Sequence, residues 1–486
     1  MTYHVAVDIG ASSGRVILAS KENNQLKLDE VHRFKNGFTF KGGHDRWNVT
    51  TLVEEILQGL HKVKALGVEN CTIGIDTWAV DYCLIDANGD LLAEPVAYRD
   101  ARTDGIMEQV FARIPKQTIY DKTGIQFLNF NTLYQLYVED KELLAQADKI
   151  LLVPDYIAYR LTGKAFGEVT NVSTTQFLNI HTRDYDADLL ALLDIPRSKF
   201  PDLIETGEVV GELLPEVREA YDLPQAQVIA VATHDTGSAV VGVPATSDNY
   251  AYISSGTWSL IGVENTVPLT GSDAFEANYT NEWGAYQTYR FLKNITGMWT
   301  VQEIARMTDY QYSFAEMAEQ AFQVEPFLQY VDLNDDRFTN PANMIEEIQA
   351  YCRERGAVVP ETLGELVMCV YSNLALAYGH EWKRLEKLTG KALDCLHIVG
   401  GGSNVSLLNQ LTADIIGKEV VAGPGEATAI GNVLVQLIAL GDFASLAEAR
   451  AWLDDNMAFE TFTPQELADR DHLESYQRAV LKDFDI

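Results

Sequence analysis

Short apolar runs and tight polar turns alternate at the start of the chain. A mostly apolar segment at residues 4–9 ends in a Gly/Ser turn at 10–14, and a second mostly apolar segment follows at 15–19. Two strands joined by so short a connection have to be antiparallel, so this stretch predicts a hairpin. A third strand is expected at 26–34, after an Asn-Asn turn.

The spacing of apolar residues then changes from that of a strand to that of a helix. Between Leu52 and Val63 apolar residues recur three or four positions apart, with Asn48 or Thr50 as the candidate N-cap. A further strand is predicted at 72–75. The first domain is therefore expected to open with three strands, a helix and a strand.

The middle of the chain contains a longer apolar run that leads into a polar turn. Residues 228–232 are all apolar and predict a strand buried on both faces, and a helix is expected from about Gly237. Between them, residues 233–237 supply hydroxyls, an imidazole, a carboxylate and a flexible turn. Asp235 is open to two interpretations: the N-cap of the helix, or a functional carboxylate beside free N–H groups.

The second half of the chain repeats this order. Residues 250–263 again fit strand, turn and strand, with Ser254–Thr257 in the place that Ser12–Arg15 takes in the first half. A helix, a strand, a glycine turn and a helix are then expected at 363–388, 396–399, 400–402 and 407–416. The pattern predicts an internal duplication in which each half is a whole domain, unlike the short repeats of a solenoid.

The length of 486 residues also predicts two large domains. A polar linker at 245–249 divides the chain into domains at 1–244 and 245–486. The tail after about residue 450 is expected to pack back on the first domain, and 462–486 is expected to be a charged surface helix.

The charge balance restricts the partners. The chain has 37 Lys and Arg against 70 Asp and Glu, a formal charge of −33, whereas a nucleic-acid partner would need a basic face. We therefore expect no nucleic-acid partner, and an anionic ligand would be held by backbone N–H groups, a metal ion or a few basic residues. The sequence has no signal-peptide pattern and no apolar run long enough to span a membrane, which predicts a cytoplasmic protein without a membrane partner.

The five cysteines form no CxxC pair and no zinc-like spacing with histidine. Buried free thiols are expected. A pairing of Cys352 with Cys369 stays open, although a cytoplasmic location argues against a lasting disulfide.

The turn between the first two strands combines several groups that can hold a phosphate. Asp8 ends a buried strand, where a carboxylate is costly unless it is paired or bound to a cation. The backbone at Gly10 and Gly14 can approach a ligand closely, and Arg15 adds a fixed positive charge. A plain hairpin turn with a solvated arginine is the alternative. The Gly-Lys-Ser/Thr pattern of a P-loop is absent.

Six segments taken together resemble a known family. They are Val7–Arg15, Ile75–Asp81, Tyr98–Arg102, Gly124–Phe127 with Asn131–Leu136, Ser254–Leu260 and His397–Gly402. Through them the chain resembles, from end to end, the FGGY carbohydrate kinases of the actin-like ATPase superfamily. The resemblance implies an α/β fold of two ribonuclease-H-like domains with a central cleft between them. It places the sugar against the first domain and ATP against the second.

The resemblance also implies roles for single residues. Asp235 corresponds to the catalytic base and Asp8 to the residue that holds Mg²⁺. The implied substrate contacts are Ala79, His234, Asp235, Thr236 and Asn294; at Ala79 the most similar kinases often have glycine. The implied ATP-binding residues are Ala11, Ser12, Ser13, Gly14, Arg15, Thr257, Gln302 and Gly401.

Within the family, the segments are most similar to those of L-rhamnulose kinases. This implies transfer of a phosphoryl group from Mg-ATP to the 1-hydroxyl of L-rhamnulose, a step of L-rhamnose catabolism. Another ketose or deoxyketose such as L-fuculose is the alternative within the family. An actin-like or chaperone-like ATPase and an inactive binding protein are the alternatives from other classes. The sequence leaves the choice between monomer and homodimer open.

Overall fold

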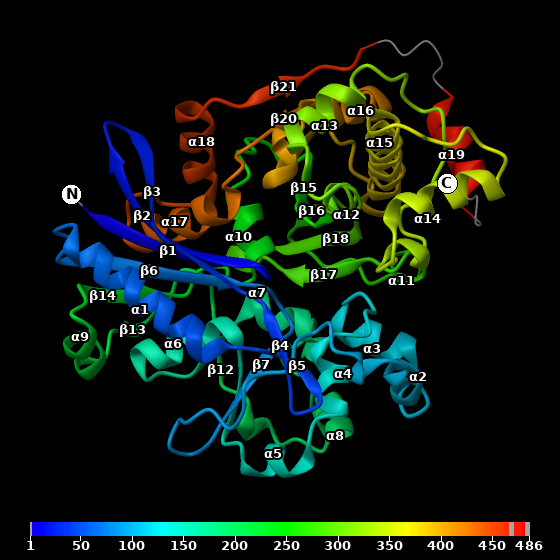
Figure 1. Cartoon of the computed structure of the whole chain (residues 1–486). Coiled ribbons are helices and arrows are strands. Elements are labelled where there is room, and N and C mark those ends of the chain that lie inside the picture. The colour runs from blue at the N-terminus through cyan, green and yellow to red at the C-terminus, as the bar shows by residue number, and fades with distance from the viewer. Residues whose placement is uncertain (1, 466–470, 482–486) are drawn as a thin grey trace. The chain divides into compact units, whose positions relative to one another are not determined.

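The computed structural model describes residues 2–465 and 471–481 (Figure 1). The chain divides into two compact units. Unit 1 comprises Met1–Thr246, Glu264–Phe291 and Ala427–Met457, and unit 2 comprises Ser247–Val263, Leu292–Glu426 and Ala458–Ile486. The units therefore differ from two contiguous halves, because two segments from the second half of the sequence pack with the first.

Unit 1 is built on a six-stranded sheet with the order β13-β14-β6-β1-β2-β3. The predicted hairpin is confirmed, since β1 and β2 pair antiparallel, and β3 continues it on the other side of β2. Strands β1, β6 and β14 run parallel to one another. The bounds are Tyr3–Ile9 for β1, Ser13–Glu22 for β2, Gln25–Lys35 for β3, Asn70–Thr77 for β6, Val209–Glu212 for β13 and Gln225–Ile229 for β14. The strand expected at 228–232 thus lies three residues earlier.

Two helices cover one face of this sheet and build the core of unit 1. The predicted helix is confirmed as α1 (Val49–Ala65), and the Asn48 side chain caps it by accepting a hydrogen bond from the Thr51 N–H. Its apolar stripe packs with α6 (Val153–Thr162) against the side chains of β1 and β6 that point to that face. Helix α1 runs along this face in Figure 1.

The opposite face of the sheet is covered by α17 (Ala427–Ala439), which contacts both β1 and β6. This helix crosses α10 (Asp235–Val241) with the two backbones in direct contact. A Cβ at Gly431 would lie 1.8 Å from the Ser238 carbonyl oxygen, and one at Gly242 would lie 2.4 Å from the Ala427 carbonyl oxygen. The crossing therefore requires glycine at both positions.

Replacing Gly431 by alanine should separate the two helices, because no flexible side chain stands between the new methyl group and the α10 backbone. We expect a loss of about 1–3 kcal/mol in the free energy of unfolding, the usual cost of overpacking. Turnover should fall as well, since α10 begins at Asp235. Urea unfolding and steady-state kinetics measure the two effects. Gly37→Ala, at an exposed position where the new methyl group meets nothing within 4 Å, is the control and should leave stability and turnover unchanged. An unchanged stability of the Gly431 variant would contradict the close crossing.

Most strands of the second sheet belong to unit 2. The order is β17-β18-β16-β15-β19-β20-β21, with an antiparallel β15/β16 hairpin and β19 parallel to β15. This repeats the arrangement of β1, β2 and β6, so the predicted duplication is confirmed in topology. The bounds are Tyr250–Ser255 for β15, Trp258–Asn265 for β16, Thr280–Trp283 for β17, Tyr289–Thr296 for β18, Cys395–Val399 for β19, Glu419–Ala422 for β20 and Glu460–Phe462 for β21.

Long helices of the second half begin and end close to their predicted positions. Helix α15 (Leu363–Thr389) starts with a capping box between Thr362 and Glu365, and α16 (Ser406–Ile416) packs against it. The other helices here are α11 (Ser272–Glu276), α12 (Trp299–Met307), α13 (Phe314–Ala321), α14 (Met344–Glu354), α18 (Leu446–Asn456) and α19 (His472–Val480).

Shorter elements complete unit 1. The helices are α2 (Ile106–Phe111), α3 (Lys116–Thr123), α4 (Thr132–Tyr137), α5 (Lys141–Gln146), α7 (Val169–Val172), α8 (Ala187–Leu193) and α9 (Pro215–Tyr221). The strands are β4 (Phe38–Lys41), β5 (His44–Trp47), β7 (Tyr82–Ile85), β8 (Lys149–Leu152), β9 (Phe166–Glu168), β10 (Leu178–Asn179), β11 (Asp184–Tyr185) and β12 (Asp202–Ile204).

The expectation of a charged surface helix over 462–486 is confirmed only in part for the described tail: α19 is a helix at His472–Val480, but one of its faces is buried. Phe462 ends β21, and α19 buries Leu473 and Tyr476, which lie three positions apart on one helix face. Apolar residues at that spacing bury their face against the rest of unit 2. Helix α18 belongs to unit 1, whereas the residues from Ala458 belong to unit 2. Residues 466–470 and 482–486 lie outside the described residues.

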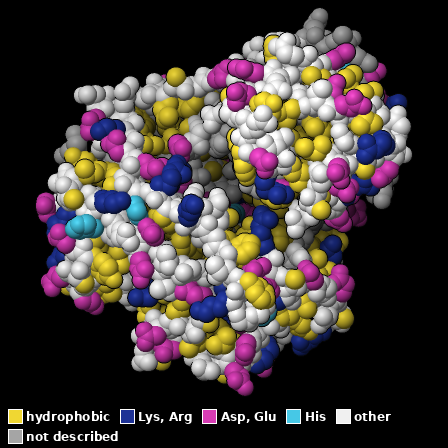
Figure 2. All heavy atoms as spheres, viewed as in Figure 1, with side chains coloured by type: hydrophobic (Ala, Val, Ile, Leu, Met, Phe, Trp, Pro, Cys, Tyr) yellow, Lys and Arg dark blue, Asp and Glu magenta, His cyan; other side chains and the backbone are white. Residues whose placement is uncertain are grey.

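All five cysteines are free thiols, Cys352 and Cys369 included. None of the helices in the described part of the chain is long and apolar enough to cross a membrane. On the face shown in Figure 2, basic side chains are interspersed with acidic ones rather than gathered into one surface.

Candidate active site

The parallel strands of unit 1 bring acidic residues to one edge of the sheet. Asp8 and Asp76 lie opposite each other in the register of β1 and β6, one residue before the end of each strand. The chain after β14 continues along the end of β6, where the Thr77 N–H donates to the Thr233 carbonyl at 2.9 Å, and Asp235 follows. Carboxyl ends of parallel strands are the common location of ligand sites in α/β sheets.

Asp8 is paired with the arginine predicted beside it. Arg15 Nη2 donates to Asp8 Oδ2 at 2.5 Å, and both side chains are mostly buried. The turn between them leaves Ala11 and Ser12 exposed. Gly14 lies beneath the Phe34 ring, which a Cβ would approach to 2.3 Å. Unit 1 thus presents a short exposed turn with a charged pair at its base.

Asp76 is fully buried at the same edge. Its Oδ2 accepts a hydrogen bond from Asn432 Nδ2 of α17 at 2.6 Å, whereas its Oδ1 has no hydrogen-bond partner among the described residues. Burial, together with the negative charges of Asp8 and Asp235, raises the pKa of Asp76 well above its usual range.

Helix α10 begins at Asp235, two residues before the predicted start at Gly237, and its N-cap is His234. His234 makes no capping bond with its side chain. Asp235 Oδ1 accepts hydrogen bonds from the N–H of Thr236 at 2.5 Å and from its hydroxyl at 3.2 Å. The carboxylate stays about one-third exposed, with 34% of its side chain accessible. It can therefore meet a ligand while its orientation is fixed.

A buried ion pair stands behind His234. Arg290 Nη2 lies 3.0 Å from Glu282 Oε2 and 3.1 Å from His234 Nδ1, and the Arg290 side chain is completely inaccessible. Burial raises the pKa of Glu282, but the charge of Arg290 outweighs it and leaves the pKa below its ordinary value. The other ring nitrogen of His234, Nε2, lies 3.4 Å from Asp235 Oδ1. The row Arg290–His234–Asp235 thus orients the carboxylate.

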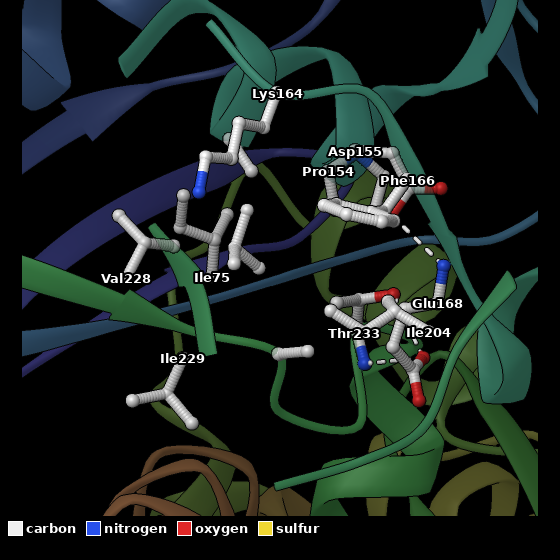
Figure 3. A pocket seen from close by; sticks show the side chains of 13 residues that line it. Ile75, Pro154, Asp155, Lys164, Phe166, Glu168, Ile204, Val228, Ile229 and Thr233 are labelled. Atoms are coloured by element: carbon white, nitrogen blue, oxygen red, sulfur yellow. Dashed lines mark hydrogen bonds between the residues drawn. The ribbon is translucent and has the colours of Figure 1, made fainter. Parts of the chain in front are cut away.

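A second buried carboxylate fixes the turn before His234. Glu168 Oε2 accepts hydrogen bonds from the N–H and the hydroxyl of Thr233, at 3.1 and 3.0 Å. Both residues border a small cavity inside unit 1, walled mostly by apolar side chains such as Ile75 and Val228 (Figure 3). Burial raises the pKa of Glu168, against the effect of its hydrogen bonds with Thr170, Thr206 and Thr233. The cavity is interior packing space, so we place no substrate there.

The predicted substrate contact Ala79 lies in a strained turn. Val80 has a φ of +66°, an unusual conformation for a β-branched residue, and the Asp81 N–H donates to the Ala79 carbonyl at 2.9 Å. The Asp81 carboxylate is buried and accepts from the indoles of Trp47 and Trp78, at 2.6 and 3.0 Å. Burial raises the pKa of Asp81 to about 6 despite these bonds.

Aromatic side chains surround this turn. Trp47 packs on Trp78 with ring centroids 4.3 Å apart, and Tyr98 packs on Phe130 at 5.3 Å. Burial raises the pKa of Tyr98, and the charges of Asp81 and Asp235 add to this rise. Tyr98 and Phe130 are partly exposed, and such rings suit the apolar faces of a sugar.

The predicted ATP-binding residues of the second half gather at one end of the unit 2 sheet. Thr257 follows β15, and its hydroxyl donates to Gln302 Oε1 of α12 at 3.4 Å. The glycine turn after β19 approaches the same strand end, since a Cβ at Gly402 would lie 1.9 Å from Ser255 Oγ. Gly401 is exposed within that turn. Asn294 lies on β18 and is partly exposed.

The donors around Asp8 fit a hard divalent cation. They are carboxylate oxygens, and within the described chain no hydrogen-bond donor reaches the buried Oδ1 of Asp76. Among the described residues no group of three or more His, Cys, Asp or Glu side chains could hold a metal ion by itself. Phosphate oxygens and waters would complete the coordination, as is usual for Mg²⁺.

Sequence reasoning missed four residues of this region. Asp76 carried a usable signal, because it ends a buried strand parallel to the strand of Asp8. Glu168, Glu282 and Arg290 carried none, since they occur in no motif and meet the turn at 233–236 only through the fold.

Comparison with known proteins agrees with the fold. Residues 3–242 match the N-terminal domain of the FGGY family of carbohydrate kinases, and residues 251–440 match its C-terminal domain. A xylulose kinase from Lactobacillus acidophilus superposes with a TM-score of 0.79 over 99% of this chain and 96% of its own, at 17% identity. A Plasmodium falciparum glycerol kinase with ADP superposes with a TM-score of 0.80 over 99% and 97%, at 16% identity.

Relatives with higher sequence identity are named rhamnulokinases. The protein of Ligilactobacillus salivarius is 52% identical over 99% of this chain and 100% of its own length. Those of Lactiplantibacillus plantarum and Bacillus subtilis are 51% and 50% identical, over 98% and 99% of both chains. The predicted fold class, α/β with two domains of this kinase type, is confirmed. The chain belongs to the FGGY family of carbohydrate kinases.

Proposed function

We propose that this protein transfers the γ-phosphoryl group of ATP to the 1-hydroxyl of L-rhamnulose, giving ADP and L-rhamnulose 1-phosphate for L-rhamnose catabolism. The observation that carries the sugar assignment is the end-to-end identity of about one half to proteins named rhamnulokinase. The observation that carries the chemistry is an oriented, accessible Asp235 at the carboxyl edge of the unit 1 sheet.

Asp235 acts as the base. Its Oδ1 is occupied by the Thr236 N–H and hydroxyl, which leaves the other oxygen to accept the proton of the sugar hydroxyl as the new bond forms. His234 holds the carboxylate from the side and, with Thr236, Ala79 and Asn294, is proposed to contact the sugar. The aromatic side chains at Tyr98 and Phe130 exclude water from the apolar face of the ring. Excluding water protects ATP from hydrolysis.

Phosphoryl transfer depends mainly on positioning and on neutralising phosphate charge. We assign the phosphates in unit 1 to Ala11, Ser12, Ser13, Gly14 and Arg15, whose N–H, hydroxyl and guanidinium groups can donate to phosphate oxygens. In unit 2 the nucleotide residues are Thr257, Gln302 and Gly401. The cation of this family is proposed to be Mg²⁺, held through Asp8, and when bound it would neutralise charge on the phosphates. An enzyme that consumes ATP is proposed to work in the cytoplasm.

An ADP-release assay with a panel of sugars tests the substrate. We expect kcat/KM for L-rhamnulose to exceed the values for L-fuculose, D-xylulose and glycerol by at least about 10²-fold, the discrimination that unpaired polar groups in a binding site can impose. The product is identified as the 1-phosphate by phosphorus NMR. Equal rates with D-xylulose or glycerol would show that the substrate assignment is wrong, and ADP release that no sugar stimulates would favour an ATPase of another kind.

A further inference from the structure

A buried chain of hydrogen bonds crosses unit 1 between the sheet and α17, and it ends at Asp76. Its members on the sheet point to the face that α17 covers, and its other members lie on α17 itself. The links run from His4 Nδ1 to Thr72 Oγ1 (2.8 Å), from Thr72 Oγ1 to Gln436 Oε1 (2.6 Å), from Gln436 Nε2 to Asn432 Oδ1 (2.7 Å) and from Asn432 Nδ2 to Asp76 Oδ2 (2.6 Å).

Every link of this chain donates toward Asp76. The Thr72 hydroxyl gives its single proton to Gln436, so it has to accept the Nδ1–H of His4. Burial lowers the pKa of His4 to about 4, which leaves a neutral imidazole at neutral pH. Asp76 is the terminal acceptor, and its carboxyl group cannot rotate without breaking the bond from Asn432.

A glycine in β6 leaves room for this chain of hydrogen bonds. A Cβ at Gly74, two residues before Asp76, would lie 2.2 Å from Asn432 Oδ1 and 2.9 Å from Gln436 Nε2. Asn432 and Gln436 are four residues apart on α17 and therefore share one helix face. The absence of a side chain at Gly74 thus leaves room for the amides of Asn432 and Gln436. Their hydrogen bonds hold one oxygen of the Asp76 carboxyl in place.

The charge of Asp8 lies close to the same carboxyl group. Oδ1 of Asp76 is buried without a hydrogen-bond partner among the described residues, and Asp8 lies opposite in register on the neighbouring strand. Adjacent strands are about 4.8 Å apart, and paired residues of parallel strands point to the same face. A buried carboxyl oxygen without a partner is costly, and a hard cation is a ligand that would satisfy it.

We propose that Asp76 supplies a second carboxylate oxygen, beside Asp8, to the divalent cation that accompanies ATP, and that Asn432 and Gln436 position it. Asp76 belongs to the cation site, and the two amides are positioning residues. The inference rests on the proposed kinase function, because that function brings the cation to this edge of the sheet. A purely structural Asp76 would instead serve only to attach α17 to β6.

Binding of Mn²⁺ in the presence of ADP separates these two roles without measuring turnover. Bound Mn²⁺ is quantified by the loss of the free-ion signal in electron paramagnetic resonance. We expect Asp76→Asn to weaken Mn²⁺ binding by about 10- to 100-fold, the range found for groups that orient or support a metal site. Asn432→Leu should also weaken Mn²⁺ binding, because Asp76 Oδ2 loses its hydrogen-bond donor.

Asp155→Asn is the matched control. Asp155 is also a buried carboxylate of unit 1 with one oxygen lacking a partner, but it lies in α6 beside Glu168. Its replacement should leave Mn²⁺ affinity unchanged within the error of the measurement, whereas Asp8→Asn should weaken it. Thermal unfolding of each variant checks that the fold is intact.

Three outcomes decide the inference. Equal Mn²⁺ affinity of the wild type and Asp76→Asn, with weaker binding by Asp8→Asn, overturns it and leaves the proposed function standing. Failure of the wild type to bind Mn²⁺ with ADP overturns the proposed function itself. If Asp76→Asn does not fold, anomalous scattering from Mn²⁺ in wild-type crystals with ADP replaces it: a peak joined to Asp76 Oδ1 directly or through one water supports the inference, and a more distant peak overturns it.

Discussion

Replacement of Asp235 by asparagine is expected to lower kcat by about 10²- to 10⁴-fold, the usual contribution of a general base. Asparagine keeps the size of the side chain and can still accept the hydrogen bonds from Thr236, but it cannot take the proton of the sugar hydroxyl. ATP binding should stay close to normal. Steady-state kinetics give kcat, and fluorescence titration with a nucleotide analogue gives the affinity.

The same chemical change at Asp202, whose side chain is 90% exposed, is the control and should leave kcat unaltered. Near-normal turnover of the Asp235 variant would remove that residue from the mechanism. A loss of ATP affinity equal to the loss of kcat would show instead that the substitution disturbs the nucleotide.

Replacement of Arg290 by methionine is expected to reduce the free energy of unfolding by about 3–5 kcal/mol, because it leaves an uncompensated charge in the interior. The charge is that of Glu282, which is 7% exposed and ion-paired with Arg290. His234 would also lose the donor to its Nδ1, so turnover should fall with stability. Equilibrium urea unfolding at neutral pH measures the effect.

The free energy of unfolding at acidic pH tests the Glu282–Arg290 ion pair in a second way. The pKa of Glu282 is depressed in the folded protein, so its contribution to stability is present above the ordinary value of 4.5 and is lost as the pH falls further. The gap between wild type and the Arg290 variant should therefore narrow below that pH. The double variant Glu282→Gln with Arg290→Met should recover much of the lost stability. A single variant as stable as wild type would mean that Glu282 is not charged in the interior.

The sequence predicted those parts of the fold that depend on neighbouring residues. Apolar alternation placed the first hairpin, helical spacing placed α1 and α15, and the repeated order of elements predicted the duplicated topology. The ends of two elements differ from the predicted ones. Helix α10 takes in Asp235 and Thr236, and β14 ends at Ile229 although the apolar run continues to Ala232.

The residues of the candidate site also fall into two groups, those that local sequence motifs identify and those that only the fold brings together. Asp8, Arg15 and the turn at 233–236 occur in motifs, so their residue types and spacing pointed to them. Glu282 and Arg290 reach His234 from β17 and β18, about fifty residues further along the chain, and no local pattern announces such a contact. The compact units also could not be deduced, because the segments at 264–291 and 427–457 join unit 1 through packing alone.

The membership of α17 in unit 1 has a consequence for how the protein is made. This helix covers the face of β1 and β6 that carries His4, Thr72 and Gly74. During synthesis that face stays without its cover until residues 427–457 have left the ribosome, long after the strands themselves. A fragment that stops at the linker after residue 244 would contain the strands but expose polar and apolar surface that has no other cover. Gene halves divided at that linker are thus poor candidates for separate expression.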